Sequence, residues 1–568
     1  MGGLRKEKWM VFSAWPYVNA IPHLGNMIGS VLSADIAARF LRMKGAEVVF
    51  ASGSDQHGTP VEVEAIKRGV DPRKLADEMH EKVKELFEKW MISFDIYTKT
   101  ENPVHVEFVR EFYRKVYENG YIFDDVVQVL YCPRDGLFLP DRFVEGTCPY
   151  CGYPKARGDQ CDNCGRLLDP LMLVEPRCVI CGSKPVVRDS RHWFFDLPKL
   201  AEMLRKYIEE NPHLPDNARN MSLQMIKEGL KPRSLTRDNK WGIPAPFPGA
   251  EGKTIYVWME AVLGYVSAVK ELFERRGEPE KWREFWLDPN TKSVYFIGKD
   301  NIPFHTIIFP ALLMASGEGY VLPWTVASTE YLMFEGDKFS KSRGIGIWID
   351  EALELLPVDY WRFALIAMRP EVRDVNFTWR GFQEVVNSLM NDIIGNFIHR
   401  ALTLVKRRFN YVIPEPGELR ECDKQVLGEA WDRVEEAEKF MYEFRFKRAL
   451  SSIVEVASIG NRYLNERRPW EEARDEAAKT LFVACSLVKT LAITLAPIIP
   501  CSAQRAWEML GYEGRVEEAG WDEAKRPVRP GLRIRDPKPL FRKISDKELE
   551  ELKAKLARLR QSRTSPSR

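Results

Sequence analysis

Short apolar runs and helical spacings alternate along the first 119 residues of the chain. Uninterrupted apolar residues at positions 9–12 and 48–51 predict two buried strands. A helical stretch over 27–43 separates them, and apolar positions at helical spacing predict amphipathic helices over 72–91 and 105–118. Strands that alternate with helices favour a parallel sheet with helices packed on its faces.

This alternation is interrupted and then resumes. From about residue 121 to 187 the chain is rich in Cys, Gly and Pro and predicts only short strands, as expected of an inserted metal-binding module. Helices are predicted over 199–210 and 221–228, before a Pro-rich stretch at 242–248. The economical interpretation is one Rossmann-like sheet interrupted by an insertion. In the second half, strands are predicted at 254–258, 293–297 and 321–327, and helices at 261–275 and 304–316.

The last third of the chain has a predominantly helical pattern. Apolar residues recur every three or four positions from about residue 382 to 510, most clearly over 385–404 and 478–496. Residues 546–560 predict a charged amphipathic helix, and 561–568 predict a disordered basic tail.

Length and composition narrow the possibilities. With 568 residues, the chain is long enough for three or four domains. A hydrophobic content of 45% and a charged content of 29% are typical of a soluble globular protein. No run of about 18 or more uncharged apolar residues and no secretory leader is present, so we expect no membrane span and a cytoplasmic location. The net charge of +2 means that any nucleic-acid-binding surface must be local.

Seven of the ten cysteines lie between residues 132 and 181, where C-x-x-C pairs followed by Gly recur. In an apparently cytosolic chain, this clustering favours metal over disulfides. With four protein ligands a zinc site has no open position, so we expect structural ions only. The inner pairs predict one Zn²⁺ site made of Cys148, Cys151, Cys161 and Cys164. The outer residues predict a second Zn²⁺ site in which a carboxylate replaces one thiolate: Cys132, Asp135, Cys178 and Cys181.

Two short runs carry candidate nucleotide chemistry. The first, residues 23–26 (His-Leu-Gly-Asn), precedes a predicted helix, and the free N–H groups of a helix N-terminus attract phosphate. Here His23 could donate a hydrogen bond to a phosphate or to a pyrophosphate leaving group. The second run places Lys338 and Lys341 on a glycine-bracketed loop, where they could neutralise a polyphosphate. The alternative interpretation is a helix-capping histidine and a solvated lysine loop.

Together and in this order, the two runs resemble the HIGH and KMSKS signatures of class I aminoacyl-tRNA synthetases. Residues 13–25 (SAWPYVNAIPHLG) are similar to the opening motif of methionyl-tRNA synthetases, and residues 340–344 (SKSRG) match their second motif. The resemblance runs from about residue 8 to 540. It has two departures: Asn26 stands where many members have a second histidine, and Phe339 replaces the usual methionine.

The resemblance implies that the chain forms methionyl-adenylate from L-methionine and ATP, with Mg²⁺ accompanying ATP. It would then transfer methionine to the 3′ end of tRNA(Met), for initiation and elongation of translation. The implied catalytic residues are His23, Asn26, Lys338 and Lys341. The implied ATP-binding residues are His23, Gly25, Asn26, Gly298, Lys338 and Lys341, and Asp300 is expected to contact the ribose or the amino acid.

A methionine pocket is also implied. Asp55 falls on the family position that holds the substrate α-amino group; as the alternative, it caps the helix that begins near residue 58. Aromatic rings give favourable sulfur contacts of about 0.3–1.5 kcal/mol, and Tyr265 and His305 would supply the polar contacts. Any one of the aromatic residues could instead be ordinary core. The wall departs from bacterial members at Trp15, Val262, Asn301 and Phe309. The implied methionine-binding residues are Trp15, Tyr17, Asp55, Trp258, Ala261, Tyr265, Asn301 and His305.

An anticodon-binding surface is implied in the helical part. Asn396 and Arg400 are four residues apart and so share a helix face. In the family, the equivalents of Asn396, Arg400 and Trp470 read the CAU anticodon by hydrogen bonding and base stacking. The alternative for Trp470 is a buried aromatic at a helix start. The basic run 406–408 would contact phosphate or form a solvated face.

The implied fold class is α/β: a Rossmann-like parallel-sheet catalytic domain with an inserted zinc-knuckle connective domain, followed by an all-α anticodon-binding domain. We expect a monomer. The expected boundaries are 1–119 and 254–327 for the catalytic domain, 120–253 for the insertion, 328–381 for a KMSKS-loop and stem-contact region, 382–540 for the anticodon-binding domain, and 541–568 for a C-terminal helix and tail.

Two other functions remain open from the sequence. The chain could be a class I synthetase for another apolar or sulfur-containing amino acid, although such enzymes usually carry a larger editing insertion. It could also be a non-catalytic tRNA-binding or zinc-ribbon adaptor. The presence of His23, Asp55 and the two loop lysines argues against an adaptor, because binding alone does not need them.

Overall fold

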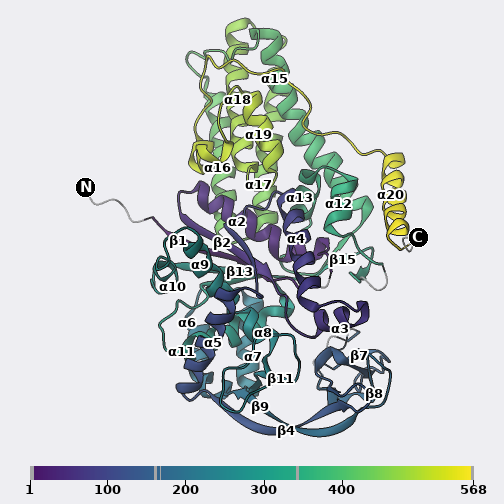
Figure 1. Cartoon of the computed structure of the whole chain (residues 1–568). Helices are drawn as coiled ribbons and strands as arrows, with labels where there is room; N and C mark the ends of the chain where they lie inside the picture. The colour runs from purple at the N-terminus through teal and green to yellow at the C-terminus, as the bar shows by residue number, and fades with distance from the viewer. Residues whose placement is uncertain are drawn as a thin grey trace.

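The structure is a computed structural model that describes residues 6–18, 20–158, 161, 163–164, 166, 168–340 and 344–564, with side chains to residue 561. Lys341, one of the two predicted loop lysines, lies outside the described residues. Figure 1 shows three parts along the molecule: an all-helical part at one end, a central part built on a sheet, and a small part carried on a long β-ribbon at the other end.

A five-stranded sheet forms the centre of the α/β part. Its strand order is β14-β13-β1-β2-β3, and every neighbouring pair is parallel, which confirms the predicted Rossmann-like sheet. Because the chain moves from β1 first to one side and later to the other, the carboxyl ends of the strands border a crevice beside β1. The strands are β1 (Lys8–Ser13), β2 (Glu47–Ser54), β3 (Ile96–Lys99), β13 (Lys292–Gly298) and β14 (Thr325–Thr329).

Both faces of the sheet are covered by helices. Alternate side chains of β1 enter opposite clusters, with Trp9 and Val11 on one face and Met10 and Phe12 on the other. The first face packs against η1 (Met27–Val31), α2 (Leu32–Met43) and α4 (Pro72–Lys89). The second packs against α5 (Pro103–Glu118), α9 (Gly264–Arg275) and α11 (Phe309–Ser316).

Three predicted elements differ from those observed. The helix expected from residue 27 already begins with α1 (Leu24–Asn26), and the strand expected over 321–327 begins at Thr325. The strand expected over 254–258 is wrong: β12 covers only Thr254–Ile255 and pairs outside the main sheet with β11 (Thr236–Arg237). The next residues form α8 (Val257–Ala261), because a short apolar run cannot distinguish a strand from a buried helix.

The insertion leaves the α/β part as a long antiparallel ribbon of β4 (Ile122–Cys132) and β9 (Val186–Phe195). Its far end carries a small sheet of order β7-β6-β8, and apolar side chains such as Val126 are exposed along the ribbon (Figure 1). Helices α6 and α7 follow and pack on the second face of the main sheet. The bounds are β6 (Val144–Thr147), β7 (Ala156–Arg157), β8 (Val174–Cys178), α6 (Ala201–Glu210) and α7 (Asp216–Glu228).

A small three-stranded sheet lies between the main sheet and the helical part. It contains β15 (Leu332–Phe334), β16 (Asp337–Lys338) and β17 (Val375–Phe377). Two helices, α12 (Ile349–Leu355) and α13 (Val358–Ala367), connect it to the rest of the chain. Residues on both sides of the predicted lysine loop are therefore held by regular structure.

The helical part is all-α, as predicted. Its helix α18 (Arg474–Leu495) is long and apolar enough to cross a membrane by length and composition alone, but 94% of its most apolar window is buried inside the protein. The last helix, α20 (Asp546–Thr564), is longer than predicted, so disorder from residue 561 is wrong as far as Thr564. The other helices are α15 (Asn396–Phe409), α16 (Glu421–Tyr442), α17 (Phe446–Arg467) and α19 (Pro500–Met509), preceded by α14 (Trp379–Glu384) and the π-helical η7 (Val385–Gly395).

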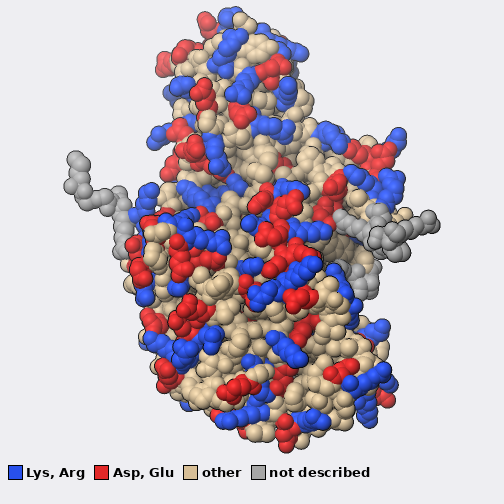
Figure 2. All heavy atoms as spheres, in the orientation of Figure 1, with Lys and Arg blue, Asp and Glu red and all other residues tan. Residues whose placement is uncertain are grey.

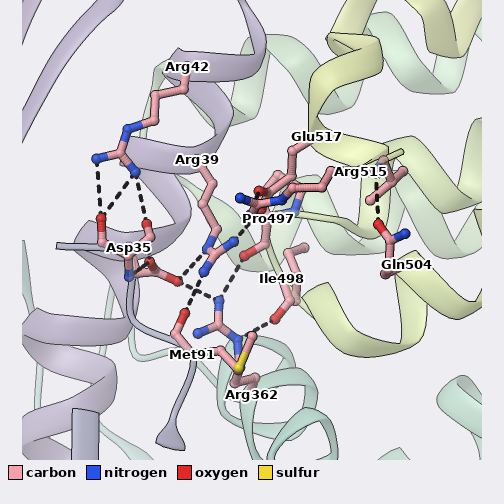
Figure 3. A network of polar contacts seen from close by, with 12 residues as sticks. Asp35, Arg39, Arg42, Met91, Arg362, Pro497, Ile498, Gln504, Arg515 and Glu517 are labelled. Carbon is pink, nitrogen blue, oxygen red and sulfur yellow. Dashed lines mark hydrogen bonds and ion pairs between the residues drawn. The ribbon is translucent and has the colours of Figure 1, made fainter. Parts of the chain in front are cut away.

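A buried charge cluster joins the helical part to the α/β part (Figure 3). Asp35 of α2 accepts hydrogen bonds from Arg39 at 3.0 Å and from Arg362 of α13 at 2.7 Å. The guanidinium of Arg362 also donates to the backbone carbonyls of Pro497 and Ile498, at 2.9 and 2.8 Å. A single buried side chain therefore contacts all three segments that meet at this junction.

Surface charges of both signs are mixed. On the face shown in Figure 2, Lys and Arg side chains alternate with Asp and Glu over the helical, central and ribbon parts. This distribution agrees with the small net charge of the sequence.

Candidate active site

The first signature run lies where β1 gives way to helix α1. The ring of His23 caps the helix: its Nδ1 accepts from the backbone N–H of Asn26 at 3.3 Å, while Asn26 Oδ1 accepts from the N–H of His23 at 3.1 Å. Burial lowers the pKa of His23 to about 4, so the ring is neutral at neutral pH. Because Nδ1 accepts, the proton lies on Nε2, and His23 keeps one ring N–H to donate.

The structure brings the two signature runs together. Phe339, which follows β16, stacks on the ring of His23 with centroids 4.5 Å apart and planes at 16°. Gly25 lies under this stack, where a Cβ would meet the His23 ring at 3.0 Å and Phe339 at 3.5 Å. The glycine of the first run and the aromatic residue of the second are therefore fitted to the same histidine.

Lys338 lies beside this stack at the end of β16. Its Nζ lies 5.3 Å from the centre of the Tyr331 ring, while Lys299 at the end of β13 is ion-paired with Glu330 at 2.6 Å. At the same strand end, a Cβ on Gly298 would approach Asp300 Oδ1 to 2.7 Å. Gly298, Asp300 and Lys338 thus border the carboxyl end of the sheet.

Tyr265 and His305 form a buried hydrogen-bonded pair. His305 Nδ1 donates to the carbonyl of Asn301 at 2.9 Å, so its Nε2 accepts from the Tyr265 hydroxyl at 2.8 Å. Burial lowers the pKa of His305 to about 4 and keeps it neutral. Asn301 takes part through its backbone in this contact. These three residues form a fixed polar group inside an aromatic cluster.

Tyr17 and Asp55 are adjacent across the ends of β1 and β2. The N–H of Asp55 donates to Pro16 O at 2.9 Å, and Trp258 Nε1 donates to the Tyr17 hydroxyl. Trp258 of α8 also packs edge-on against Phe304, the neighbour of His305, with centroids 4.8 Å apart. The predicted pocket residues therefore form one connected group.

Trp15 and Ala261 complete that group. Trp15 packs so closely that a Cβ on Gly53 would lie 2.6 Å from its ring, and one on Gly264 would lie 2.7 Å from it. Ala261 ends α8, which begins next to Trp258. The first helix turn after α8 thus presses Trp15 against the strand ends.

Asp55 carries an unused acceptor. It is 3% exposed, and Oδ1 has no hydrogen-bond partner among the residues that the structure describes. Burial and the nearby Glu260 raise its pKa well above the usual range. Helix α3 (Thr59–Arg68) is capped by Gly58, so the alternative that Asp55 caps this helix is wrong. A buried carboxyl of this kind is suited to a ligand that brings its own positive charge.

A histidine beside Asp55 is held between two carboxylates. His57 Nδ1 lies 2.6 Å from Glu260 Oε1, and its Nε2 contacts Glu101. Although burial lowers it, the pKa of His57 is raised to about 10 by Glu260 and Glu101. His57 is therefore an imidazolium at neutral pH, and it supplies positive charge next to Asp55.

The inner cysteine group could hold a metal ion. The ligand atoms of its four residues lie within 4.8 Å of one another, with Cys148 and Cys164 Sγ 3.9 Å apart and Cys151 and Cys161 Sγ 3.7 Å apart. In tetrahedral coordination, zinc–sulfur bonds of about 2.3 Å place two sulfurs about 3.8 Å apart. The donor set and its spacing therefore fit zinc.

The outer group is also assembled. Asp135 Oδ2 lies 3.2 Å from Cys132 Sγ and 3.1 Å from Cys178 Sγ, and Cys132 and Cys181 Sγ are 3.5 Å apart. The predicted carboxylate thus lies among three thiols. Ser183, which the sequence did not single out, contacts Cys181 Sγ at 2.8 Å. This group could likewise hold a metal ion.

The predicted anticodon residues line a hollow of about 470 Å³ in the helical part. The guanidinium of Arg400 lies 5.1 Å from the centre of the Trp470 ring and donates to Asn465 at 2.6 Å. Trp470 is 40% exposed in the turn after α17, so the alternative of a buried helix-start aromatic is wrong. The hollow is lined by Asn396, His399, Arg400, Thr403, Leu404, Arg407 and Trp470.

Two family models match most of the chain. One, described as tRNA synthetases class I (M), matches residues 9–402, and another, described as the anticodon binding domain of methionyl tRNA ligase, matches residues 413–561. The methionine–tRNA ligase of Thermofilum pendens is 62% identical over 565 residues, which cover 100% of both chains. The chain belongs to the methionyl-tRNA synthetase family.

Other members of the methionyl-tRNA synthetase family agree with this assignment. The methionine–tRNA ligase of Caldivirga maquilingensis is 58% identical and matches over 97% of this chain and 94% of its own. A solved structure of Mycobacterium tuberculosis methionyl-tRNA synthetase in complex with methionyl-adenylate has a TM-score of 0.78 and 25% identity, and the match covers 94% of this chain and 99% of that one.

Some residues of this methionyl-tRNA synthetase site were missed by the sequence analysis. His57, Glu101 and Glu260 form one cluster, but they come from three separate segments; only the position of His57 two residues after Asp55 gave a signal. In the basic run, Lys406 is paired with Asp536 and Arg408 donates to Trp470 O and Glu472 O, so both have structural partners. Of the three, Arg407 lines the hollow.

Proposed function

We propose that the chain is a methionine–tRNA ligase that works in two steps at the crevice beside β1. A carboxylate oxygen of L-methionine attacks the α-phosphorus of ATP, the bond to the β-phosphate breaks, and pyrophosphate leaves. A ribose hydroxyl at the 3′ end of tRNA(Met) then attacks the adenylate carbonyl, and AMP leaves. The methionyl-tRNA serves initiation and elongation. The observation that carries the proposal is the stack of Phe339 on His23, which joins the two signature runs.

Phosphate binding in this proposal is electrostatic and positional. The Nε2–H of His23 donates to a phosphate oxygen, while Asn26 holds the ring by the reciprocal cap. Gly25 and Gly298 let the backbone approach the nucleotide because a side chain at either place would collide with its neighbours. Lys338 and Lys341 neutralise the charge of the leaving pyrophosphate. Mg²⁺ enters with ATP and neutralises phosphate charge.

Methionine binding uses the unused acceptor of Asp55. The substrate ammonium would pair with Asp55 Oδ1 and relieve the cost of burying this carboxyl. The hydroxyl of Tyr265, already hydrogen-bonded to His305, contacts the thioether sulfur. The walls of the slot are formed by Trp15, Tyr17, Trp258, Ala261 and Asn301.

The remaining sites have structural and recognition roles. Each knuckle group holds a Zn²⁺ ion with all four positions occupied by protein, so zinc orders the insertion and takes no part in the reaction. Asn396, Arg400 and Trp470 bind the anticodon, and the exposed indole offers a stacking surface for an unpaired base. The protein acts as a cytoplasmic monomer.

Amino-acid-dependent exchange of pyrophosphate into ATP tests the first step. With a panel of amino acids we expect methionine to support exchange and leucine, isoleucine and valine to support little. Exchange driven by leucine instead would favour a different class I synthetase, and no exchange with any amino acid would favour the adaptor.

Two lysine variants test the phosphate assignment. Lys341→Ala and Lys338→Ala should each lose most exchange activity with unchanged thermal stability, because each lysine contributes charge without filling a core. The exposed Lys74 of α4 offers a matched control, Lys74→Ala, which should behave as wild type. Wild-type exchange by both loop variants would rule out this role.

A further inference from the structure

The C-terminal helix returns to the α/β part next to the second signature run. Figure 1 shows α20 lying beside α12, far from the bundle that precedes it in the chain. Its apolar residues Leu549, Leu552 and Leu556 are buried, and Lys555 donates to the carbonyl of Glu354 at the end of α12. The helix is thus docked by both apolar and polar contacts.

One residue of α20 makes most of the polar contacts at this place. Arg560 pairs with both carboxylate oxygens of Glu351, at 2.9 Å each, and its guanidinium lies 5.1 Å from the centre of the Trp348 ring. It also donates to Gly344 O at 2.8 Å and to Gly346 O. A planar fork with five N–H donors can make this set of contacts at once, whereas a lysine ammonium cannot.

The segment that Arg560 holds leads directly to the signature histidine. Gly346 lies against Phe339, where a Cβ would approach the ring to 2.3 Å, and Phe339 stacks on His23. The next residue, Ile347, accepts from the N–H of Leu24 at 3.0 Å. From Arg560 to His23 there is therefore a continuous series of direct contacts through residues 344–348.

Glu351 fixes the other side of this contact. It is 3% exposed, and Oε2 accepts from the N–H of Trp348 at 3.0 Å as well as from Arg560. Ile349 donates in turn to the carbonyl of Pro22, next to His23. Without Arg560, Glu351 would lose the cation that compensates its burial.

We propose that Arg560 is a positioning residue for adenylate formation. By binding the carbonyls of Gly344 and Gly346, it holds Phe339 against His23 and so fixes the histidine N–H toward the phosphates. The inference rests on the proposed function, since positioning matters only if ATP reacts at this place. Because Asp55 and Tyr265 lie on other elements, methionine binding should not depend on Arg560.

The test is the steady-state kinetics of pyrophosphate exchange by the full-length protein. Loss of charged hydrogen bonds should lower kcat of Arg560→Gln by roughly 10- to 100-fold, with the KM for methionine unchanged. Arg560→Lys, which keeps the charge but not the fork, should share most of this loss. The control is Arg558→Gln, an exposed position on the same helix, which should keep the wild-type kcat.

A double-mutant cycle with Glu351→Gln checks the contact itself. We expect the two single losses to be non-additive, because both remove one interaction. A wild-type kcat for Arg560→Gln, an equal loss in Arg558→Gln, or a loss that tracks a fall in thermal stability overturns the positioning role. The proposed function is tested separately, since it fails only if the wild-type protein shows no methionine-dependent exchange.

Discussion

Two buried charge clusters in the α/β part have opposite designs. At the junction with the helical part, both oxygens of Asp35 accept hydrogen bonds, from Ser93 on one side and from Arg39 and Arg362 on the other. Beside the strand ends, Asp55 is equally buried, yet Oδ1 has no partner among the described residues. The first cluster is complete without a ligand, whereas the second lacks a cation.

The difference shows how burial can serve either structure or binding. A matched buried cluster fixes neighbouring segments, because removing one member leaves the others without compensation. An incomplete cluster costs free energy until a ligand supplies the missing charge, and part of that cost returns as affinity. Four predictions follow the scale of this effect from large to small.

The largest effect concerns the thiol groups, which are the extreme case of a cluster completed by a ligand. Structural zinc contributes an apparent free energy of about 10–16 kcal/mol, so Cys161→Ser should release one ion and unfold the ribbon end while the main sheet stays folded. Zinc content and hydrogen exchange of residues 122–195 measure this. Cys422→Ser, at an exposed cysteine outside both groups, is the control. Full zinc content in Cys161→Ser contradicts the assignment.

The next effect is at the junction. Arg362→Met leaves Asp35 buried beside one fewer cation, so we expect the free energy of unfolding to fall by about 3–5 kcal/mol. The midpoint of urea unfolding measures the change, with Arg114→Met at an exposed position of α5 as the control. Equal midpoints for the two variants would show that the cluster is not structural.

At Asp55 we expect the reverse pattern. Asp55→Asn removes the partner of the substrate ammonium at a cost of about 2–5 kcal/mol, so the KM for methionine should rise by roughly 30- to 5,000-fold. Stability should stay equal or increase, because an unpaired buried carboxyl is lost. Asp189→Asn, on the exposed β9, provides the comparison. A normal KM, or a loss of stability as large as that of Arg362→Met, would remove the distinction between the clusters.

The smallest effect is a slope with pH. The pKa of His57 is raised to about 10 in the folded chain, so the folded state binds one more proton than the unfolded state between pH 6.5 and 10. This stabilisation is complete below pH 6.5 and is lost as pH approaches 10. Relative to His57→Gln, wild-type stability should fall by about 1.4 kcal/mol per pH unit between pH 7 and 9. Parallel pH profiles would contradict a charged His57.

Local patterns predicted much of the fold. The parallel sheet followed from apolar runs and helical spacing, because each of these elements is long enough to show its period. Residues 254–258 did not, since five apolar residues fit either a strand or the buried turn of α8. Helix α18 is apolar nearly all round because it is enclosed by its neighbours, so its pattern carries no directional signal.

The site was predictable where its residues are close in sequence. His23, Gly25 and the loop lysines lie in short runs whose chemistry is visible in order. The cluster around His57 was not, because Glu101 and Glu260 are separated from it by 44 and 203 residues and their contacts exist only in the folded chain. The capping box of Asn26 was also missed, although its spacing is local.

The strand order has a consequence for the growing chain on the ribosome. β1 lies in the middle of the sheet, but its partner β13 is made much later, and 285 residues separate Glu7 from its ion-pair partner Lys292. At a synthesis rate of about 5–20 residues per second, one edge of β1 waits roughly 15–60 s for pairing. Over that interval the nascent protein must protect an open, apolar strand, while the knuckle insertion has time to find its ions first.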